Sequence, residues 1–160
     1  MSDTAEHNTT TPTVIVAFLN YNTADECLRA LAAMPAALRD IDARVIVIDN
    51  GSTDDSLSRL KSFDEELEII SLPHNHGFAG AFNVLFAQVE APWYFLLNSD
   101  IILPPHAVKE MVNATGKESD VGLAAPALYR EDGTAQASYS AFPSLARELC
   151  NRSLYRGLTW

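Results

Sequence analysis

The stretch "VIVIDNGSTDDS" (residues 45–56) changes character at its middle. Four apolar β-branched residues come first and are typical of a strand that is covered on both faces of a parallel sheet. The turn residues Asn50-Gly51 follow, and Ser52 with the aspartates after it suits the start of a helix. The turn and the cap do not explain Asp49, which ends the apolar run at a position where a carboxylate can accept a hydrogen bond from a ligand. We therefore predict a strand, a turn and a helix, with a carboxylate that faces a ligand and adds little stability without it.

The same alternation extends through the chain. Thr23 and Glu26 form the T-x-x-E pattern of a capping box, and Asp132-Gly133 separates two short extended pieces, which predicts a hairpin. Apolar runs that predict strands lie at residues 13–19, 43–49, 67–72, 93–98 and 121–128. Helical composition is found at residues 24–34, 54–63, 78–89 and 105–116. This order predicts an α/β fold with a right-handed, mostly parallel sheet flanked by helices.

Composition excludes several classes of protein. With 160 residues, 48% of them hydrophobic, the chain can bury the core of one domain. Its net charge of −10 argues against nucleic acid as a partner. Cys27 and Cys150 have no metal-ligand neighbours, so we expect two reduced thiols in a cytoplasmic protein. Residues 1–12 have the composition of a disordered polar tail rather than of a signal peptide, and no apolar run is long enough to cross a bilayer.

Polar residues follow each of the first four predicted strands. In an open parallel sheet, ligands bind beyond the carboxyl ends of the strands. A turn would explain any one of these polar clusters taken alone. Four clusters at the carboxyl edge of one sheet indicate a ligand site. Gly77 and Gly80 would let a ligand approach the backbone N–H groups of a helix start, although neither a dinucleotide fingerprint nor a phosphate loop is present. The clusters are Asn20 to Asn22, Asp49 to Asp54, residues 73–83 and Asn98 to Asp100.

Asp100 lies at the centre of an apolar stretch, "YFLLNSDIILPP" (residues 94–105). A carboxylate at a strand end can hold a hard divalent cation, which prefers oxygen ligands. Alternatively, Asp100 caps the helix that begins near Pro105. The residues alone leave both interpretations open.

Four motifs in this order resemble the inverting family-2 glycosyltransferases of the GT-A fold, particularly the rhamnosyltransferase-like branch. They are "VIVAFLNYN" (14–22), "VIVIDNGSTDDS" (45–56), "NHGFAGAFN" (75–83) and "FLLNSDIIL" (95–103). Residues 121–144 are also similar to that branch, so the resemblance covers about residues 13–145. It implies a GT-A type, Rossmann-like, mostly parallel sheet flanked by helices, with a C-terminal hairpin and helix.

The resemblance also implies a reaction: transfer of a sugar from a dTDP- or UDP-sugar to a glycan or lipid-linked acceptor in cell-wall or polysaccharide biosynthesis, with Mg or Mn bridging the diphosphate. Asp100 would be the metal ligand, as the last carboxylate of a D-x-D signature whose first position is here Asn98. That missing charge should weaken metal binding in the absence of nucleotide. The implied donor-binding residues are Asn20, Asn22, Asp49, Asn50, Asn75, Gly77, Gly80, Asn83 and Asn98.

The implied domain organisation is a nucleotide-sugar-binding domain over residues 13–142 and a helical segment over residues 143–160. An inverting enzyme needs a carboxylate base, which the family places well beyond the hairpin. Only Glu148 follows Pro143 here, and we do not assign it as the base. We therefore expect the donor-binding, N-terminal part of a longer enzyme, located in the cytoplasm or at the inner face of the membrane. A homodimer is possible.

Two other classes of function remain. A sugar-nucleotide pyrophosphorylase would carry a Gly-rich loop with Arg and Lys directly after the first strand, where this chain has Asn20-Tyr21-Asn22. A non-catalytic nucleotide-binding or assembly module could retain the fold without the base.

Overall fold

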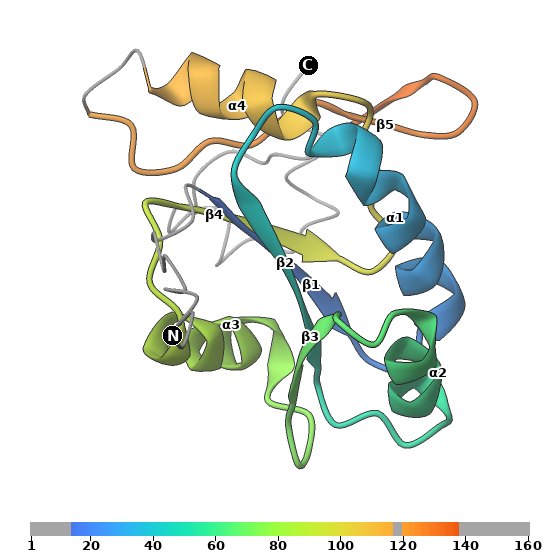
Figure 1. Cartoon of the computed structure of the whole chain (residues 1–160). Coiled ribbons are helices and arrows are strands. Elements are labelled where there is room, and N and C mark those ends of the chain that lie inside the picture. Colours follow the sequence, from blue (N-terminus) through green and yellow to red (C-terminus); the bar gives the residue numbers. More distant parts are fainter. Residues whose placement is uncertain (1–13, 117–119, 138–160) are drawn as a thin grey trace, which may run out of the picture. The chain divides into compact units, whose positions relative to one another are not determined.

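The computed structural model describes residues 14–116 and 120–137, which fall into two compact units divided in the sequence between Gly122 and Leu123. The first unit contains a parallel sheet with the strand order β3-β2-β1-β4 (Figure 1). Its elements are β1 (Val14–Asn20), α1 (Ala24–Ala37), β2 (Ala43–Asp49), α2 (Ser56–Phe63), β3 (Glu68–Ser71), α3 (Gly77–Gln88), β4 (Trp93–Asn98) and α4 (Ala107–Thr115). The second unit is a hairpin of β5 (Leu128–Tyr129) and β6 (Ala135–Gln136).

The register of the sheet aligns the strand ends that carry the polar clusters. Asn20 pairs with Asp49 across β1 and β2, and Leu19 pairs with Asn98 across β1 and β4. After β1 the chain builds β2 and β3 on one side, and it then returns to place β4 on the other side of β1. Such a reversal opens a crevice at the carboxyl ends of the two strands that flank it. We call this carboxyl edge of the sheet the rim.

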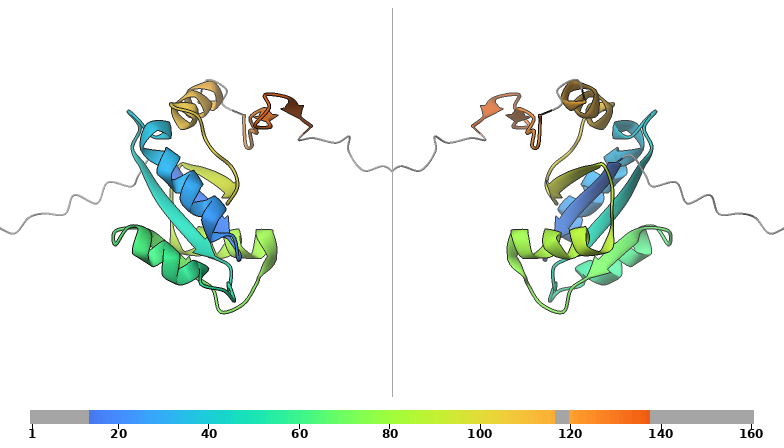
Figure 2. Two further views of the ribbon diagram at one scale, coloured as in Figure 1. Left: turned by 90° about the vertical axis from the view of Figure 1, so that its right-hand side faces the viewer. Right: turned by 90° about the vertical axis from the view of Figure 1, so that its left-hand side faces the viewer.

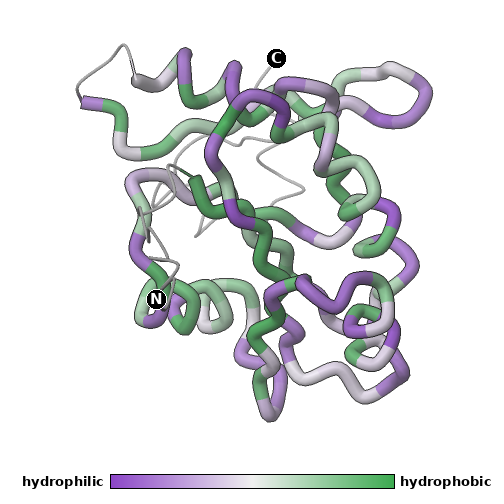
Figure 3. Tube along the Cα trace, viewed as in Figure 1, coloured by the Kyte–Doolittle hydropathy of each residue, from purple (hydrophilic) through white to green (hydrophobic). Residues whose placement is uncertain are grey.

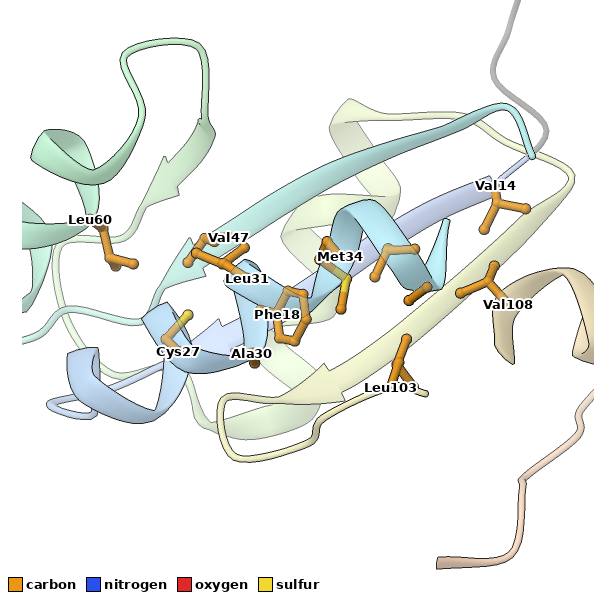
Figure 4. Close-up of a cluster of buried hydrophobic side chains, with 12 residues drawn as sticks. Val14, Phe18, Cys27, Ala30, Leu31, Met34, Val47, Leu60, Leu103 and Val108 are labelled. Carbon is orange, nitrogen blue, oxygen red and sulfur yellow. The ribbon is translucent and has the colours of Figure 1, made fainter. Parts of the chain in front are cut away.

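Helices cover both faces of the sheet, as the continuous apolar strands predicted. Side chains of β1 alternate between the faces: Val14, Val16 and Phe18 join a cluster with α1, α2 and α4 (Figure 4), whereas Ile15 and Ala17 join a second cluster with α3. Figure 2 shows α2 and α3 on opposite sides of the sheet. In Figure 3 the hydrophobic β2 leads into a hydrophilic loop at the rim. The two buried cores thus fix the strand ends from which the polar loops project.

The predicted strand over residues 121–128 is wrong. Residues 121–127 form no regular structure, and only Leu128–Tyr129 is extended, pairing antiparallel with Ala135–Gln136. Small side chains and a proline explain the difference: Gly122, Ala124 and Ala125 bury little surface, and Pro126 cannot donate a hydrogen bond to a neighbouring strand. The predicted hairpin is confirmed. The predicted tail at 1–12 and the helical segment at 143–160 lie outside the described residues, as does Cys150.

Helices α1 and α2 begin at or within two residues of their predicted starts, but both predicted caps are wrong. Thr23 stands at the N-cap of α1 but its side chain makes no capping hydrogen bond, so the capping box with Glu26 does not form. Similarly, α2 begins at Ser56, and Ser52 does not cap it. Both hydroxyls bind other rim residues instead. At the other end, α1 continues through Pro35 in its last turn, although proline cannot donate a helix hydrogen bond. Over the described ranges, no helix is both long and apolar enough to span a bilayer.

Candidate functional site

A buried carboxylate lies directly beneath the rim. Asp49 is 1% exposed and Asn20, its neighbour across the sheet, is fully buried. The Asn20 amide donates to Asp49 Oδ1 at 2.9 Å, and the Ser52 hydroxyl donates to the same oxygen at 2.6 Å. The Ser52 backbone N–H donates to Asp49 Oδ2 at 3.2 Å. This pairing corrects the prediction that Asp49 adds little stability without a ligand: Asp49 is a buried acceptor that joins β1 to the loop after β2.

Ser52 and Asn22 extend this connection between the two loops. The Ser52 hydroxyl accepts hydrogen bonds from the Asn20 amide at 3.1 Å and from the Asn22 backbone N–H at 3.0 Å. The Asn22 side chain donates to Thr53 Oγ1 at 3.2 Å and accepts from the Thr53 N–H at 2.8 Å. Asn22 has a positive φ of 56°, a conformation that asparagine tolerates better than most residues. The loops after β1 and β2 are therefore held in one arrangement on both sides of Tyr21.

A second set of amides joins the loop after β2 to the loop after β3. Asn50, which is 2% exposed, donates to Asn75 Oδ1 at 3.0 Å and accepts from the His76 backbone N–H at 2.9 Å. Asn75 Oδ1 also accepts from the Gly77 N–H at 2.8 Å. Gly51 is needed here for two reasons: its φ is +74°, and a Cβ at this position would lie 2.5 Å from backbone atoms of His74. The two loops pack backbone against backbone.

An open hollow of about 390 Å³ lies at the carboxyl ends of β1 and β4, where the strand order reverses. Its charged lining residues are both acidic, Glu26 and Asp100, and none of the described residues that line it is basic. Asn98 and Asp100 are exposed, and their side chains make no hydrogen bond to another described residue. The lining consists of Leu19, Tyr21, Thr23, Glu26, Asn98, Ser99 and Asp100.

The structure brings most, but not all, of the predicted site residues together. Asn98 and Asp100 line the hollow, and the buried networks contain Asn20, Asn22, Asp49, Asn50, Asn75 and Gly77. Gly80 packs against His76, since a Cβ there would lie 3.0 Å from His76 Cβ, so its small size serves packing. Asn83 is exposed, lies in the middle of α3 and makes no hydrogen bond to any of these described residues. Their roles toward a ligand remain predictions.

Sequence reasoning did not include Thr23, Glu26 or Ser99 among the site residues. All three line the hollow. The T-x-x-E pattern of Thr23 and Glu26 predicts only a local cap. The signal that could have found them is their position within six residues of the end of the first strand, in the loop and first helical turn that parallel α/β sheets use for binding.

Asp100 lies in a turn after β4 and does not cap α4. The N-cap of α4 is His106, and no side chain caps it. The helix-cap interpretation of Asp100 is therefore wrong, and its carboxylate is available at the hollow.

The Cys27 thiol lies in the core beneath the rim. Burial, together with the nearby charge of Asp49, raises the pKa of this thiol to about 12. Cys27 therefore stays protonated at neutral pH and is a structural thiol, as predicted for a reduced cysteine.

The residues at the hollow fit a hard divalent cation that arrives with a ligand. Asp100 offers a carboxylate and Asn98 an amide oxygen, which are donors that Mg²⁺ and Mn²⁺ accept. Over residues 14–116 and 120–137, no group of three or more His, Cys, Asp or Glu side chains could hold a metal by itself. This donor set matches ions that take one or two carboxylates and complete their coordination with substrate phosphates.

Residues 13–159 match the sequence profile of the family described as Glycosyl transferase family 2. This match covers more than half of the chain. The chain belongs to this family.

Two curated relatives show how much of a longer protein this family-2 chain spans. An uncharacterized glycosyltransferase of Nostoc sp. is 26% identical over 152 residues, which are 92% of the chain and 47% of the relative. A teichoic acid poly(glycerol phosphate) polymerase of Staphylococcus epidermidis is 30% identical over 100 residues, which are 60% of the chain and 14% of the relative. The chain thus spans less than half of either relative.

Solved structures of similar fold confirm the predicted GT-A architecture. The mannosyltransferase PcManGT of Pyrobaculum calidifontis, in complex with GDP-Man and Mn²⁺, matches with a TM-score of 0.57 at 22% identity, over 70% of this chain and 34% of that one. TarS of S. aureus (residues 1–349), in complex with UDP, matches with a TM-score of 0.55 at 22% identity, over 66% of this chain and 32% of that one. The four-stranded parallel sheet with flanking helices is therefore a GT-A type, Rossmann-like fold.

Proposed function

We propose that this chain binds a nucleotide-diphosphate sugar at the rim, together with Mg²⁺ or Mn²⁺, and supplies the donor side of an inverting glycosyl transfer. The observation that carries the proposal is the hollow at the reversal of strand order, which exposes Asp100 at the same edge of the sheet as the buried Asn20–Asp49 pair. Membership of a glycosyltransferase family gives this arrangement its chemical context.

The charges at the hollow support a donor that carries its own cation. Glu26 and Asp100 would repel a bare diphosphate, since the described lining offers it no basic side chain. A divalent cation held by Asp100 and Asn98 would neutralise the diphosphate and stabilise it as the leaving group. On the nucleoside side, Asp49 Oδ2 accepts one hydrogen bond and retains a free lone pair for a base N–H or a ribose hydroxyl. Tyr21, exposed at the hollow, offers a ring face to the base.

The finer assignments rest on the resemblance. We assign the chain to the rhamnosyltransferase-like branch, with residues 13–142 as the donor domain and a glycan or lipid-linked acceptor. A relative named for teichoic acid synthesis supports a cell-surface polymer as the acceptor class. Within the hairpin, hydrogen bonds from Thr134 lower the pKa of Asp132, so the surroundings of this carboxylate do not raise its basicity toward that of a general base. Transfer to an acceptor is therefore proposed for the whole enzyme.

The first test is a titration with nucleoside diphosphates. We expect UDP, dTDP or GDP to bind with Mn²⁺ present, because the cation compensates the acidic lining. A ligand at a hundredfold excess over Kd adds about 2.7 kcal/mol to the free energy of unfolding, which corresponds to a Tm increase of about 5–10 °C. Calorimetric titration and thermal shift, each with Mn²⁺ and with EDTA, measure this.

The matched controls are uridine and inorganic pyrophosphate with the same ions. If nothing binds under any of these conditions, the proposal fails. If nucleotide binds but the extended enzyme transfers no sugar from any donor, the chain is a binding module that retains the fold.

Substitutions of Asp100 and Asn98 test the proposed metal binding separately from nucleotide binding. Asp100→Asn should abolish most of the advantage that Mn²⁺ gives to nucleotide binding, because the carboxylate that would hold the cation is lost. The affinity measured in EDTA should not fall, because Asp100 only repels a diphosphate that carries no cation. Asn98→Asp should increase the Mn²⁺ advantage, since it adds a second carboxylate. Nucleotide Kd values with Mn²⁺ and with EDTA measure both effects. Equal Kd values for Asp100→Asn and the parent with Mn²⁺ would exclude Asp100 as a ligand.

A further inference from the structure

A line of side-chain hydrogen bonds crosses the sheet from the turn after β4, which carries the proposed metal ligands, to Asp49 at the end of β2. The Ser99 and Thr23 hydroxyl oxygens lie 2.8 Å apart, although 76 positions separate them in the sequence. The Thr23 hydroxyl donates to Asn20 Oδ1 at 3.2 Å. The Asn20 amide in turn donates to Asp49 Oδ1. The line joins the turn after β4, the loop after β1 and the end of β2.

The direction of each hydrogen bond follows from the chemistry. A hydroxyl carries one proton, and Thr23 uses it for the Asn20 carbonyl oxygen, which can only accept. Ser99 must therefore be the donor to Thr23. All protons point the same way, toward the Asp49 carboxylate, so the charge of Asp49 sets the orientation of the Asn20 amide and of both hydroxyls.

Burial makes this line more rigid than an exposed set of polar groups. Ser99 is only 8% exposed, whereas Asn98 and Asp100 on either side of it are exposed. All three residues line the hollow, but among the described residues only the Ser99 side chain is bonded to another element, through Thr23. Thr23 is the N-cap residue of α1, but its hydroxyl binds Ser99 and Asn20 and does not cap the helix. A buried polar group that loses such a partner is costly, so the alternative positions of the turn are disfavoured.

We propose that Ser99 and Thr23 are positioning residues that hold Asp100 and Asn98 in the arrangement required for the cation. This inference rests on the proposed function. Residues that orient metal ligands typically contribute 10- to 100-fold to metal affinity, and neither hydroxyl needs to touch the ion for this effect.

The test compares variants by the ratio of the nucleotide Kd in EDTA to the Kd in Mn²⁺, with UDP, dTDP and GDP each titrated. Ser99→Ala removes a donor at the end of the line and leaves Thr23 bonded to Asn20, so the folded chain should persist. We expect it to lower the ratio by about tenfold or more, with the Kd in EDTA within about twofold of the parent. Thr23→Val should lower the ratio as well, and Thr23→Ser should restore it because the hydroxyl returns. Ser62→Ala is the control, since that exposed hydroxyl of α2 binds the Ser58 carbonyl and no other group of the described residues.

The outcomes separate this inference from the proposed function. Unchanged ratios in Ser99→Ala and Thr23→Val, or no restoration by Thr23→Ser, overturn the inference while nucleotide binding stands. An equal loss of affinity in EDTA and in Mn²⁺ also overturns it, because the hydroxyls would then contact the nucleotide directly. A parent chain whose nucleotide affinity does not depend on Mn²⁺ overturns the inference and the metal part of the proposed function, while nucleotide binding stands. A parent chain that binds no nucleotide contradicts the proposed function and this inference together.

Discussion

Asp49→Ala is expected to lower both the stability of the ligand-free chain and its affinity for nucleotide. The substitution leaves the Ser52 hydroxyl and backbone N–H without their acceptor, and it removes one of two acceptors from the buried Asn20 amide. We expect a loss of about 2–4 kcal/mol in the free energy of unfolding, because hydrogen bonds to a buried charge are stronger than average. For a chain of this length the Tm should fall by about 6–12 °C. Nucleotide affinity should fall at least about tenfold, the usual effect of losing one hydrogen bond to a charged group.

Ile46→Ala separates the two effects of Asp49→Ala. Ile46 lies on the same strand, is buried in the cluster with α3 and is three residues before the rim. Its truncation should cost about 2–5 kcal/mol and leave the loops at the rim in place. Thermal unfolding and nucleotide titration at a temperature where all variants are folded measure the comparison. If Asp49→Ala binds nucleotide as tightly as Ile46→Ala does, Asp49 has no role in recognition; if its Tm equals that of the parent, the buried pairing contributes nothing.

Gly51→Ala is expected to be the most destabilising single-methyl change at the rim. A Cβ at Gly51 would lie 2.5 Å from His74 backbone atoms, and the residue has a φ of +74°, so the change adds a collision with backbone to an unfavourable conformation. The conformation alone costs roughly 1–2 kcal/mol, and the loop after β3 must move to relieve the collision. We expect a total loss of about 3 kcal/mol or more, together with weaker nucleotide binding.

Gly77→Ala is the matched control for this prediction. Gly77 has a similar φ of +70°, but a Cβ there would meet nothing within 4 Å. Gly77→Ala should therefore lower the free energy of unfolding by only about 1–2 kcal/mol, the cost of placing alanine at a positive φ. Chemical denaturation of both variants measures the difference. Equal losses in the two variants would show that the loops after β2 and β3 do not pack as closely as the structure places them.

Much of the fold followed from local sequence. Strands β1 to β4 and helices α1 to α4 lie within a few residues of their predicted ranges, because continuous apolar runs and helical composition act over short distances. The gathering of Asn20, Asp49 and Asn98 was also predictable, since parallel strands place their carboxyl ends at one edge. The strand prediction for residues 121–128 failed because the length and apolar character of a segment do not provide a neighbouring strand to pair with.

Only the tertiary structure decided what the polar side chains of the rim bind. Thr23 and Ser52 carry local patterns of helix caps, yet each binds residues from other elements: Ser99 lies 76 positions from Thr23, and Asn20 lies 32 positions from Ser52. The burial of Asp49 likewise depends on Asn20 arriving from β1, and the requirement for Gly51 depends on His74 arriving from the loop after β3. A sequence pattern specifies which groups can donate and accept, whereas the partner is set by which loops the packed cores bring together.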